Sequence, residues 1–152
     1  MQLTRFTDLG LRTLMLLASA ESSGRRVTTR TIAASANASE HHVAKAVSRL
    51  AELGMVHARR GRVGGLVLTE AGRTASIGAL VRELEGDREV IECGGEHPCP
   101  LIAACRLRRA LAEAKAAFYA ELDRHTVTDL SGGIGFSAGL PIVLQLTGER
   151  TQ

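Results

Sequence analysis

Aromatic residues are scarce in this sequence of 152 residues: they make up 3% of it, and tryptophan is absent. A hydrophobic core must therefore be built from leucine, valine, isoleucine and alanine. Long apolar runs are also missing, since nothing approaches the roughly 18 consecutive apolar residues of a membrane-spanning helix. Residues 13–20 come nearest to a signal-peptide core, but they are few, and Asp8 lies where such a signal carries only positive charge. We therefore expect a cytoplasmic protein that does not associate with a membrane.

Catalytic motifs are a third absence. The sequence has no nucleophile elbow, no phosphate-binding glycine loop and no helical zinc-protease motif, so we do not expect an enzyme. Cysteine is rare as well, with three residues that all lie between positions 93 and 105. A chain of this length buries roughly 68–70% of its unfolded surface and needs no disulfides to fold. In a cytoplasmic protein, clustered thiols indicate metal or redox chemistry instead.

The charge that is present is unevenly distributed. The net charge is +3, yet residues 1–75 hold eleven Lys and Arg against five Asp and Glu, whereas residues 76–152 hold eight against eleven. The first half thus carries +6 and the second −3. A basic first half favours a polyanionic partner for that part of the chain.

Hydrophobic periodicity predicts a mainly α-helical chain. Capping residues and glycines mark where its elements begin and end. We expect helices at 4–20, 28–36, 39–53, 76–85 and 105–123, a further helical turn at 126–130, and a hairpin with strands 55–59 and 65–69. Residues 140–146 fit either a packed strand or a poorly ordered tail.

Three helices followed by a glycine-tipped hairpin are typical of a winged helix-turn-helix. In that fold the second helix of the turn enters the major groove of DNA, and the hairpin contacts the backbone or the minor groove. We expect this DNA-binding domain at residues 1–75. Residues 76–130 would supply dimerisation helices, including a long C-terminal one, with a cluster-binding loop at 87–105, and residues 131–152 a tail of uncertain structure.

Polar side chains able to reach phosphates or base edges gather on the helix 39–53 and in the hairpin. They are Ser39, His41, His42, Lys45, Ser48 and Arg49 on the helix, and Arg59, Arg60 and Arg62 in the hairpin. The alternative is that these residues form the solvated faces of an ordinary small domain. The hairpin and the charge asymmetry favour binding of double-stranded DNA.

The segment CGGEHPCPLIAAC, residues 93–105, holds all three cysteines with five residues in each gap. Its glycines and prolines argue against thiols buried in a core. A zinc site with His97 as fourth ligand is one alternative, although structural zinc sites usually have about two to four residues between neighbouring ligands. An iron–sulfur cluster needs thiolates on a loop large enough to wrap an inorganic core, and two glycines and two prolines suit such a loop.

Four stretches in this order resemble the iron–sulfur winged-helix repressors: LTRFTDLGLRTL, HVAKAVSRLAELG, ARRGRVGGLVLTEAGR and the C-x5-C-x5-C loop. The resemblance covers about residues 1–130. It implies a homodimer that binds a near-palindromic operator and represses nitric-oxide detoxification genes while a [4Fe–4S] cluster is intact. Arg108 stands where the cluster-biogenesis branch of the family has a ligand histidine, which favours the nitric-oxide-sensing branch. A regulator that senses iron–sulfur or redox status and a zinc-binding winged-helix regulator are the alternatives.

The resemblance also implies a set of cluster ligands. Cys93, Cys99 and Cys105 would each bind an iron. Asp8 of the partner subunit would be the fourth ligand, and Arg12, one turn further on, would orient its carboxylate or link it to the loop. Without the resemblance, Asp8 is a first-turn acid that the helix dipole stabilises by about 0.3–1 kcal/mol. Other candidates for the fourth ligand, from composition alone, are Glu92, Glu96 and His97.

The helix predicted at 105–123 carries more apolar surface than one small domain needs to cover. We expect its apolar stripe to pack against a second copy of the chain in a two-fold dimer. The alternative is a helix docked on its own domain. The stripe consists of Leu107, Leu111, Ala114, Phe118 and Leu122.

Overall fold

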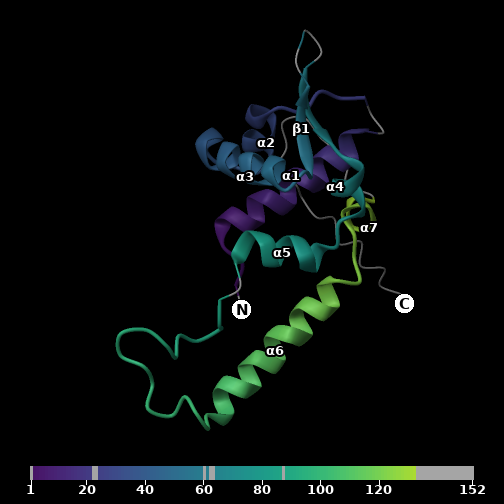
Figure 1. The fold of residues 1–152 in the computed structure, drawn as a ribbon. Helices are drawn as coiled ribbons and strands as arrows, with labels where there is room; N and C mark the ends of the chain where they lie inside the picture. The colour runs from purple at the N-terminus through teal and green to yellow at the C-terminus, as the bar shows by residue number, and fades with distance from the viewer. Residues whose placement is uncertain (1, 22–23, 60, 62–63, 87, 133–152) are drawn as a thin grey trace, which may run out of the picture.

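The computed structural model describes residues 2–21, 24–59, 61, 64–86 and 88–132. Within these ranges the chain is mainly α-helical, as predicted, with one two-stranded sheet (Figure 1). The elements are α1 (Arg5–Glu21), α2 (Thr29–Ser35), α3 (Glu40–Glu52), β1 (Val56–Arg59), β2 (Gly65–Leu68), α4 (Glu70–Thr74), α5 (Ile77–Glu85), α6 (Arg106–Leu122) and α7 (Val127–Ser131). Residues 60, 62 and 140–146, for which the sequence makes predictions, lie outside the described residues.

The predicted element boundaries agree with the structure, and each predicted helix or strand ends within one residue of the observed one. The element that the sequence did not predict is α4, a single turn that directly follows the hairpin. Thr69 begins it, because its hydroxyl accepts a hydrogen bond from the Gly72 N–H at 2.9 Å. A threonine after a strand continues that strand as readily as it caps a helix, so the local sequence does not distinguish the two.

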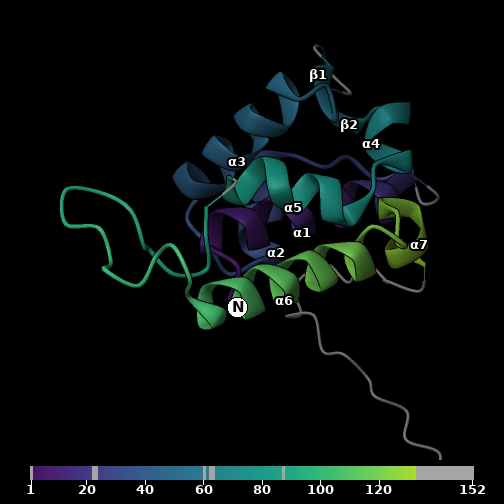
Figure 2. The same cartoon turned by 60° about the horizontal axis from the view of Figure 1, so that its bottom comes forward.

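Helix α1 lies at the centre of the fold and contacts α3, α5 and α7 (Figure 2). Four of its leucines, Leu9, Leu14, Leu16 and Leu17, are almost completely buried. Gly10 lets α5 approach closely, since a methyl group at this position would lie 2.9 Å from Leu84 Cδ1. Helix α5, which leads into the cysteine-bearing loop, is therefore packed directly on the core helix.

Helices α2 and α3 form the helix-turn-helix, and side chains cap both as predicted. The Thr28 side chain accepts a hydrogen bond from the Thr31 N–H at the start of α2, and the Ser39 hydroxyl accepts one from the His42 N–H at the start of α3. Between the helices, Asn37 adopts a left-handed conformation with φ of 47°. These caps satisfy backbone N–H groups at the start of each helix. Helix α3 has one face on the core and the other in solvent.

The hairpin β1–β2 projects from the body of the domain as a wing (Figure 1). Its strands are antiparallel, with Val56 opposite Leu68 and Arg59 opposite Gly65. The segment before α2 runs alongside β2, because the Leu66 N–H donates to the Val27 carbonyl at 2.8 Å. Only glycine fits at position 65, since a methyl group there would lie 2.6 Å from that carbonyl oxygen.

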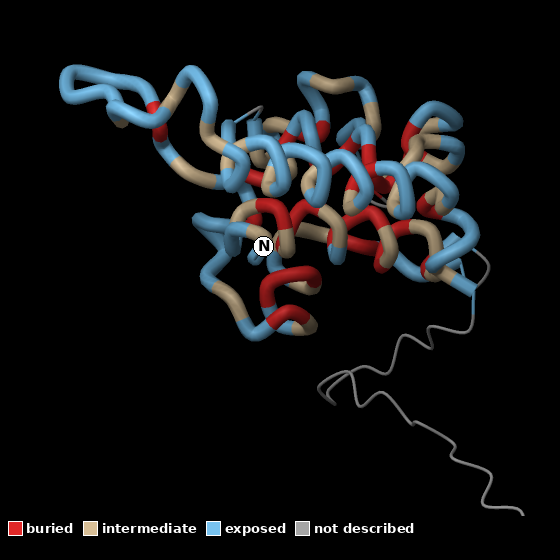
Figure 3. Tube along the Cα trace, turned by 90° about the horizontal axis from the view of Figure 1, so that it is seen from below, coloured by how far each residue is buried: buried red, intermediate tan, exposed pale blue. Residues whose placement is uncertain are grey.

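The N-terminal part of α6 and the loop before it extend away from the rest of the fold (Figure 1), and the loop projects beyond the body (Figure 3). Of the 17 residues of α6, Tyr119 alone is buried. The loop is mostly exposed, and Cys93 is its buried position. In the part of the chain that the structure describes, no helix has the length and apolar character needed to cross a membrane.

Candidate functional site

The predicted DNA-reading residues of α3 lie mainly on its solvent face. Val43, Ala46 and Leu50 are completely buried and fix which side of the helix faces the core. Because residues three and four positions apart share one face of a helix, the positions between these three point outward. The exposed predicted residues are Ser39, His41, His42, Lys45 and Ser48.

Arg49 differs from the other predicted residues of α3. Its guanidinium lies between two carboxylates, with Nη1 3.2 Å from Glu52 Oε2 and Nη2 3.3 Å from Glu83 Oε2. Glu52 belongs to α3 itself, but Glu83 belongs to α5. The structure therefore directs Arg49 toward the helix that leads to the cysteine loop.

The wing presents Arg59 in an exposed position at the end of β1. Arg60 and Arg62, also predicted to contact DNA, fall outside the described residues. The sequence analysis missed Arg25 and Arg26, which are exposed in the segment that runs alongside β2. The pair of adjacent arginines just before the capped helix 28–36 was the signal that could have suggested a DNA contact. Their place beside the wing, however, depends on the contact between Val27 and Leu66, which lie far apart in the sequence.

The three cysteines are all free thiols. The Cys99 N–H donates to the Cys93 carbonyl at 3.0 Å, which closes the first half of the loop. Cys105 caps the N-terminus of α6, because its Sγ accepts a hydrogen bond from the Arg108 N–H at 3.4 Å. Burial raises the pKa of the Cys93 thiol, and the neighbouring thiols of Cys99 and Cys105 raise it further.

The three cysteines supply the type of donor atom that a thiolate-bound group needs. Cys93 interacts electrostatically with the thiols of Cys99 and Cys105. Among the described residues, however, no three Cys, His, Asp or Glu side chains lie close enough together to hold a metal ion. In this conformation the three cysteines are themselves not gathered into such a group, and neither His97 nor Asp8 of the same chain completes one with them. Thiolates are the donors that iron–sulfur clusters normally use, so the three cysteines suit such a group by their chemistry.

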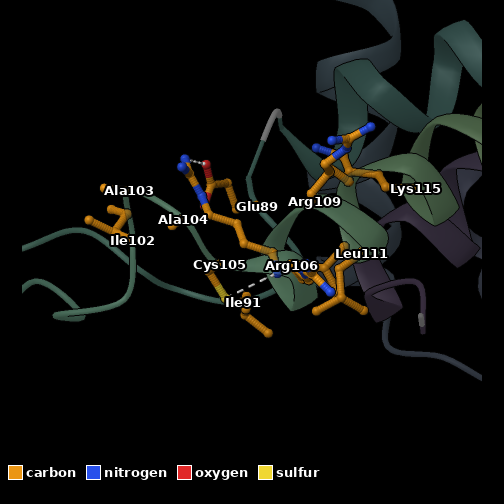
Figure 4. Close-up of a pocket in the computed structure, with 13 residues that line it drawn as sticks. Glu89, Ile91, Ile102, Ala103, Ala104, Cys105, Arg106, Arg109, Leu111 and Lys115 are labelled. Atoms are coloured by element: carbon orange, nitrogen blue, oxygen red, sulfur yellow. Dashed lines mark hydrogen bonds and ion pairs between the residues drawn. The ribbon is translucent and has the colours of Figure 1, made fainter.

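The base of the loop is closed by contacts between α6 and the segment that follows α5 (Figure 4). Arg108 donates to both carboxylate oxygens of Glu89, one of them from Nε at 3.0 Å. Two turns further along α6, Lys115 Nζ donates to the Arg88 carbonyl at 2.7 Å. Hydrogen bonding to Arg108 lowers the pKa of Glu89, and the same bond raises the pKa of Arg108. A cavity of about 500 Å³ lies here, between the loop base and the first turns of α6.

Asp8 is positioned by two arginines of its own helix. Arg12 Nε lies 2.5 Å from one carboxylate oxygen, and Arg5 Nη1 lies 3.2 Å from the other. Arg5 also donates from Nη2 to the carbonyls of Ala36 and Asn37, which form the turn between α2 and α3. The predicted contact between Arg12 and Asp8 is thus present, and the sequence analysis missed Arg5.

The apolar stripe of α6 divides into two parts. Phe118 and Leu122 pack on the hydrophobic core of their own chain. Toward the N-terminus of the helix, Leu107 is 61% exposed and Leu111 is half-buried. Ala114, between the two parts, is exposed. The C-terminal part of the helix thus docks on its own domain, and the N-terminal part leaves apolar surface exposed.

Comparisons with known proteins agree with this architecture. Residues 3–132 match the Rrf2 family, which is described as iron-dependent transcriptional regulators. The chain is 54% identical over 147 residues to the transcriptional repressor NsrR of Streptomyces coelicolor, covering 97% of each chain. It is 41% identical over 132 residues to the transcriptional regulator NsrR of Geobacillus kaustophilus, covering 86% of this chain and 89% of that one.

Solved structures share the fold. The global cysteine regulator CymR of B. subtilis superposes with a TM-score of 0.59 and 28% identity, over 89% of this chain and 99% of that one. IscR of T. potens superposes with a TM-score of 0.67 and 21% identity, over 86% of this chain and 85% of that one. The predicted winged helix-turn-helix class is confirmed.

Proposed function

This chain belongs to the Rrf2 family of transcriptional regulators, and from that premise we propose that it is a homodimeric repressor whose DNA binding depends on a [4Fe–4S] cluster and ends when nitric oxide reacts with that cluster. The coarser part of this statement is established, because the family and the two NsrR relatives are transcriptional regulators and not enzymes. The observation that carries the proposal is the loop with three free thiols, in a chain that matches a named NsrR repressor along nearly its whole length.

The DNA-binding domain is proposed to span residues 1–75, with α3 in the major groove. Its solvent face offers hydroxyl, imidazole and ammonium groups, and these donate to phosphates and base edges. The wing adds guanidinium groups that bind phosphates. The proposed DNA contacts are Ser39, His41, His42, Lys45 and Ser48 from the helix, and Arg59, Arg60 and Arg62 from the wing.

The cluster site is proposed to consist of Cys93, Cys99 and Cys105, with Asp8 of the partner subunit as fourth ligand. Thiolates are the donors that iron–sulfur clusters normally use. When bound, the cluster supplies iron that reacts with nitric oxide. The chain itself orients the donors: the start of α6 holds Cys105, the pair of Arg108 and Glu89 closes the loop, and Arg12 holds the carboxylate of Asp8.

The dimer is proposed to form through the exposed part of α6. A leucine that is 61% exposed, next to a half-buried leucine one turn away, leaves apolar surface that a second copy of the same helix would cover. Residues 76–130 are thus the proposed dimerisation and sensing part. A carboxylate donated across the dimer would link α1, the core helix of one DNA-binding domain, to the loop of the other chain.

The test begins with anaerobic purification, followed by absorption spectra and assays for iron, sulfide and zinc. We expect four irons and four sulfides per chain, and bleaching with loss of operator binding on addition of nitric oxide. Replacing Cys93, Cys99 or Cys105 singly by Ala should abolish the cluster absorption. His97→Ala is the matched control in the same loop and should retain it. Stoichiometric zinc without iron or sulfide would establish the zinc-binding alternative, and a cluster indifferent to nitric oxide would favour sensing of iron–sulfur or redox status.

A further inference from the structure

Helix α5 makes polar contacts with three other helices through side chains close together in the sequence. Arg82 Nη2 lies 2.6 Å from Asp123 Oδ2 at the C-terminal end of α6. Glu83 reaches Arg49 of α3 at 3.3 Å. Glu85 accepts from the N–H of Thr4 at 2.7 Å, directly before α1. Helix α5 therefore contacts the proposed recognition helix, the core helix and the proposed dimerisation helix (Figure 2).

The position of Arg49 is poorly suited to binding DNA. Its single positive charge lies between the carboxylates of Glu52 and Glu83, so the three groups together carry a net charge of −1. A phosphate approaching this group would be repelled overall, since affinity for the DNA backbone comes from unneutralised cations. Lys45, by contrast, lies on the fully exposed side of α3.

We infer that Arg49 is a positioning residue that ties the recognition helix α3 to α5 through Glu83, and that it does not contact DNA. This inference rests on the proposed function, in which α3 reads the operator. It adds the route by which the sensing part of the chain would act on α3, because α5 ends at Gly86, where the segment that leads into the cysteine loop begins.

Helix α5 is also held to the C-terminal end of α6, by the ion pair between Arg82 and Asp123. Hydrogen bonds from Arg82 and Ser76 lower the pKa of Asp123 to about 2, so this carboxylate is ionised at any physiological pH. A shift of α6 would therefore act on α5 through the ion pair between Arg82 and Asp123. Glu83 would then change the orientation of α3 relative to the wing.

Two assignments of Arg49 make opposite predictions for Glu83→Gln. If Arg49 links α3 to α5, this change loosens α3 and lowers operator affinity by about two- to fivefold, the size expected for one exposed ion pair. If Arg49 is instead a DNA contact that Glu83 competes for, the same change frees its charge and raises affinity. The dependence of affinity on salt gives a second criterion, because losing one phosphate contact reduces the slope by about one.

The experiment uses the full chain, purified anaerobically, and a duplex that the wild-type protein selects from a random-sequence pool. Affinities are measured over a range of salt concentrations for R49A, E83Q and the charge swap R49E/E83R. We expect both single variants to lose affinity with an unchanged salt slope. The swap should return to within about twofold of wild type, because the guanidinium placed on α5 would again face a carboxylate on α3. Thermal unfolding of each variant checks that it is folded.

Several results would overturn the inference. An increase in affinity for E83Q, a smaller salt slope for R49A, or a folded swap variant that does not bind would each show that Arg49 contacts DNA. The variant K45A distinguishes failure of the inference about Arg49 from failure of the proposed function. It should weaken binding and reduce the salt slope, and a K45A variant that binds like wild type would show that α3 does not face the DNA.

Discussion

Arg108 holds Glu89 with two nitrogen atoms of its guanidinium, and its own backbone N–H donates to the sulfur of Cys105. One residue at the start of α6 thus contacts both a proposed cluster ligand and the segment that precedes Cys93. Lys115 adds a second contact to that segment through the Arg88 carbonyl. The same helix therefore begins directly after Cys105 and contacts the segment that leads to Cys93.

Arg108→Gln and Glu89→Gln should both shorten the lifetime of the cluster. Each opens the base of the loop, and groups around metal ligands usually contribute roughly tenfold or more to metal affinity. The rate of iron release to a ferrous chelator under anaerobic conditions measures the effect, with about a tenfold increase expected. Arg109→Gln is the matched control, because Arg109 pairs with Glu113 within α6. Equal release rates in all three variants would show that the contact between Arg108 and Glu89 does not support the cluster site.

Asp8→Ala should leave a cluster on three thiolates but change its absorption and circular dichroism spectra and the operator affinity. The physical reason is that one iron would exchange a carboxylate for solvent. Asp8→Cys should give a fully thiolate-ligated cluster with slower reaction with nitric oxide. Glu21→Ala is the control, since Glu21 is an acid of the same helix with an ion pair to Arg73. Spectra and operator binding that match wild type in both Asp8 variants would leave Asp8 as a first-turn acid that the helix dipole stabilises.

The sequence was sufficient for features that depend on near neighbours. The amphipathic pattern of 39–53, with Ser39 as cap and Val43, Ala46 and Leu50 inside, is set by residues three and four positions apart. The contact between Asp8 and Arg12 follows from the same spacing. Such contacts depend on helix geometry alone, so periodicity locates them.

Features that depend on distant segments could not be predicted in this way. Glu83 lies 34 residues from Arg49. Composition gives no reason to pair them or to remove Arg49 from the DNA-reading face. Arg25 and Arg26 are likewise brought beside the wing by a backbone contact between Val27 and Leu66. In each case the tertiary fold, which no short pattern encodes, decides the partner.

Operator binding should weaken with salt as expected for about six neutralised phosphates, with a slope of log affinity against log salt near −5. Arg25→Ala together with Arg26→Ala should reduce the size of that slope by about two if both arginines bind phosphate beside the wing. Fluorescence anisotropy with a labelled duplex provides the measurement. Arg124→Ala, near the C-terminal end of α6, is the control and should not alter the slope. A double variant with the slope of wild type would place the segment before α2 outside the DNA interface.

Acid should destabilise the cluster-free protein partly through Asp123. Hydrogen bonds from Arg82 and Ser76 lower its pKa from 3.8 to about 2 in the folded state. Because the folded pKa is the lower one, the stabilising contribution is present above pH 3.8 and is lost as the pH falls toward 2. Urea unfolding between pH 5 and pH 2 should show a steeper loss of stability in wild type than in Asp123→Asn. Parallel curves for the two proteins would contradict the prediction.

Leu107→Asp and Leu111→Asp should convert the proposed dimer to a monomer. Leu107 is 61% exposed in one chain and Leu111 is half-buried, so both have apolar surface for a second copy to cover. Placing a carboxylate in such an interface costs enough to raise the dissociation constant roughly 10- to 100-fold at each site, and a two-fold axis doubles the number of sites. Sedimentation at micromolar concentration distinguishes the two states. Leu101→Asp is the matched control, because Leu101 is 68% exposed but lies in the loop outside α6. If the Leu107 and Leu111 variants sediment as dimers, the subunits associate through another surface. Asp8 would then have to reach the partner's loop by a different arrangement from the one proposed.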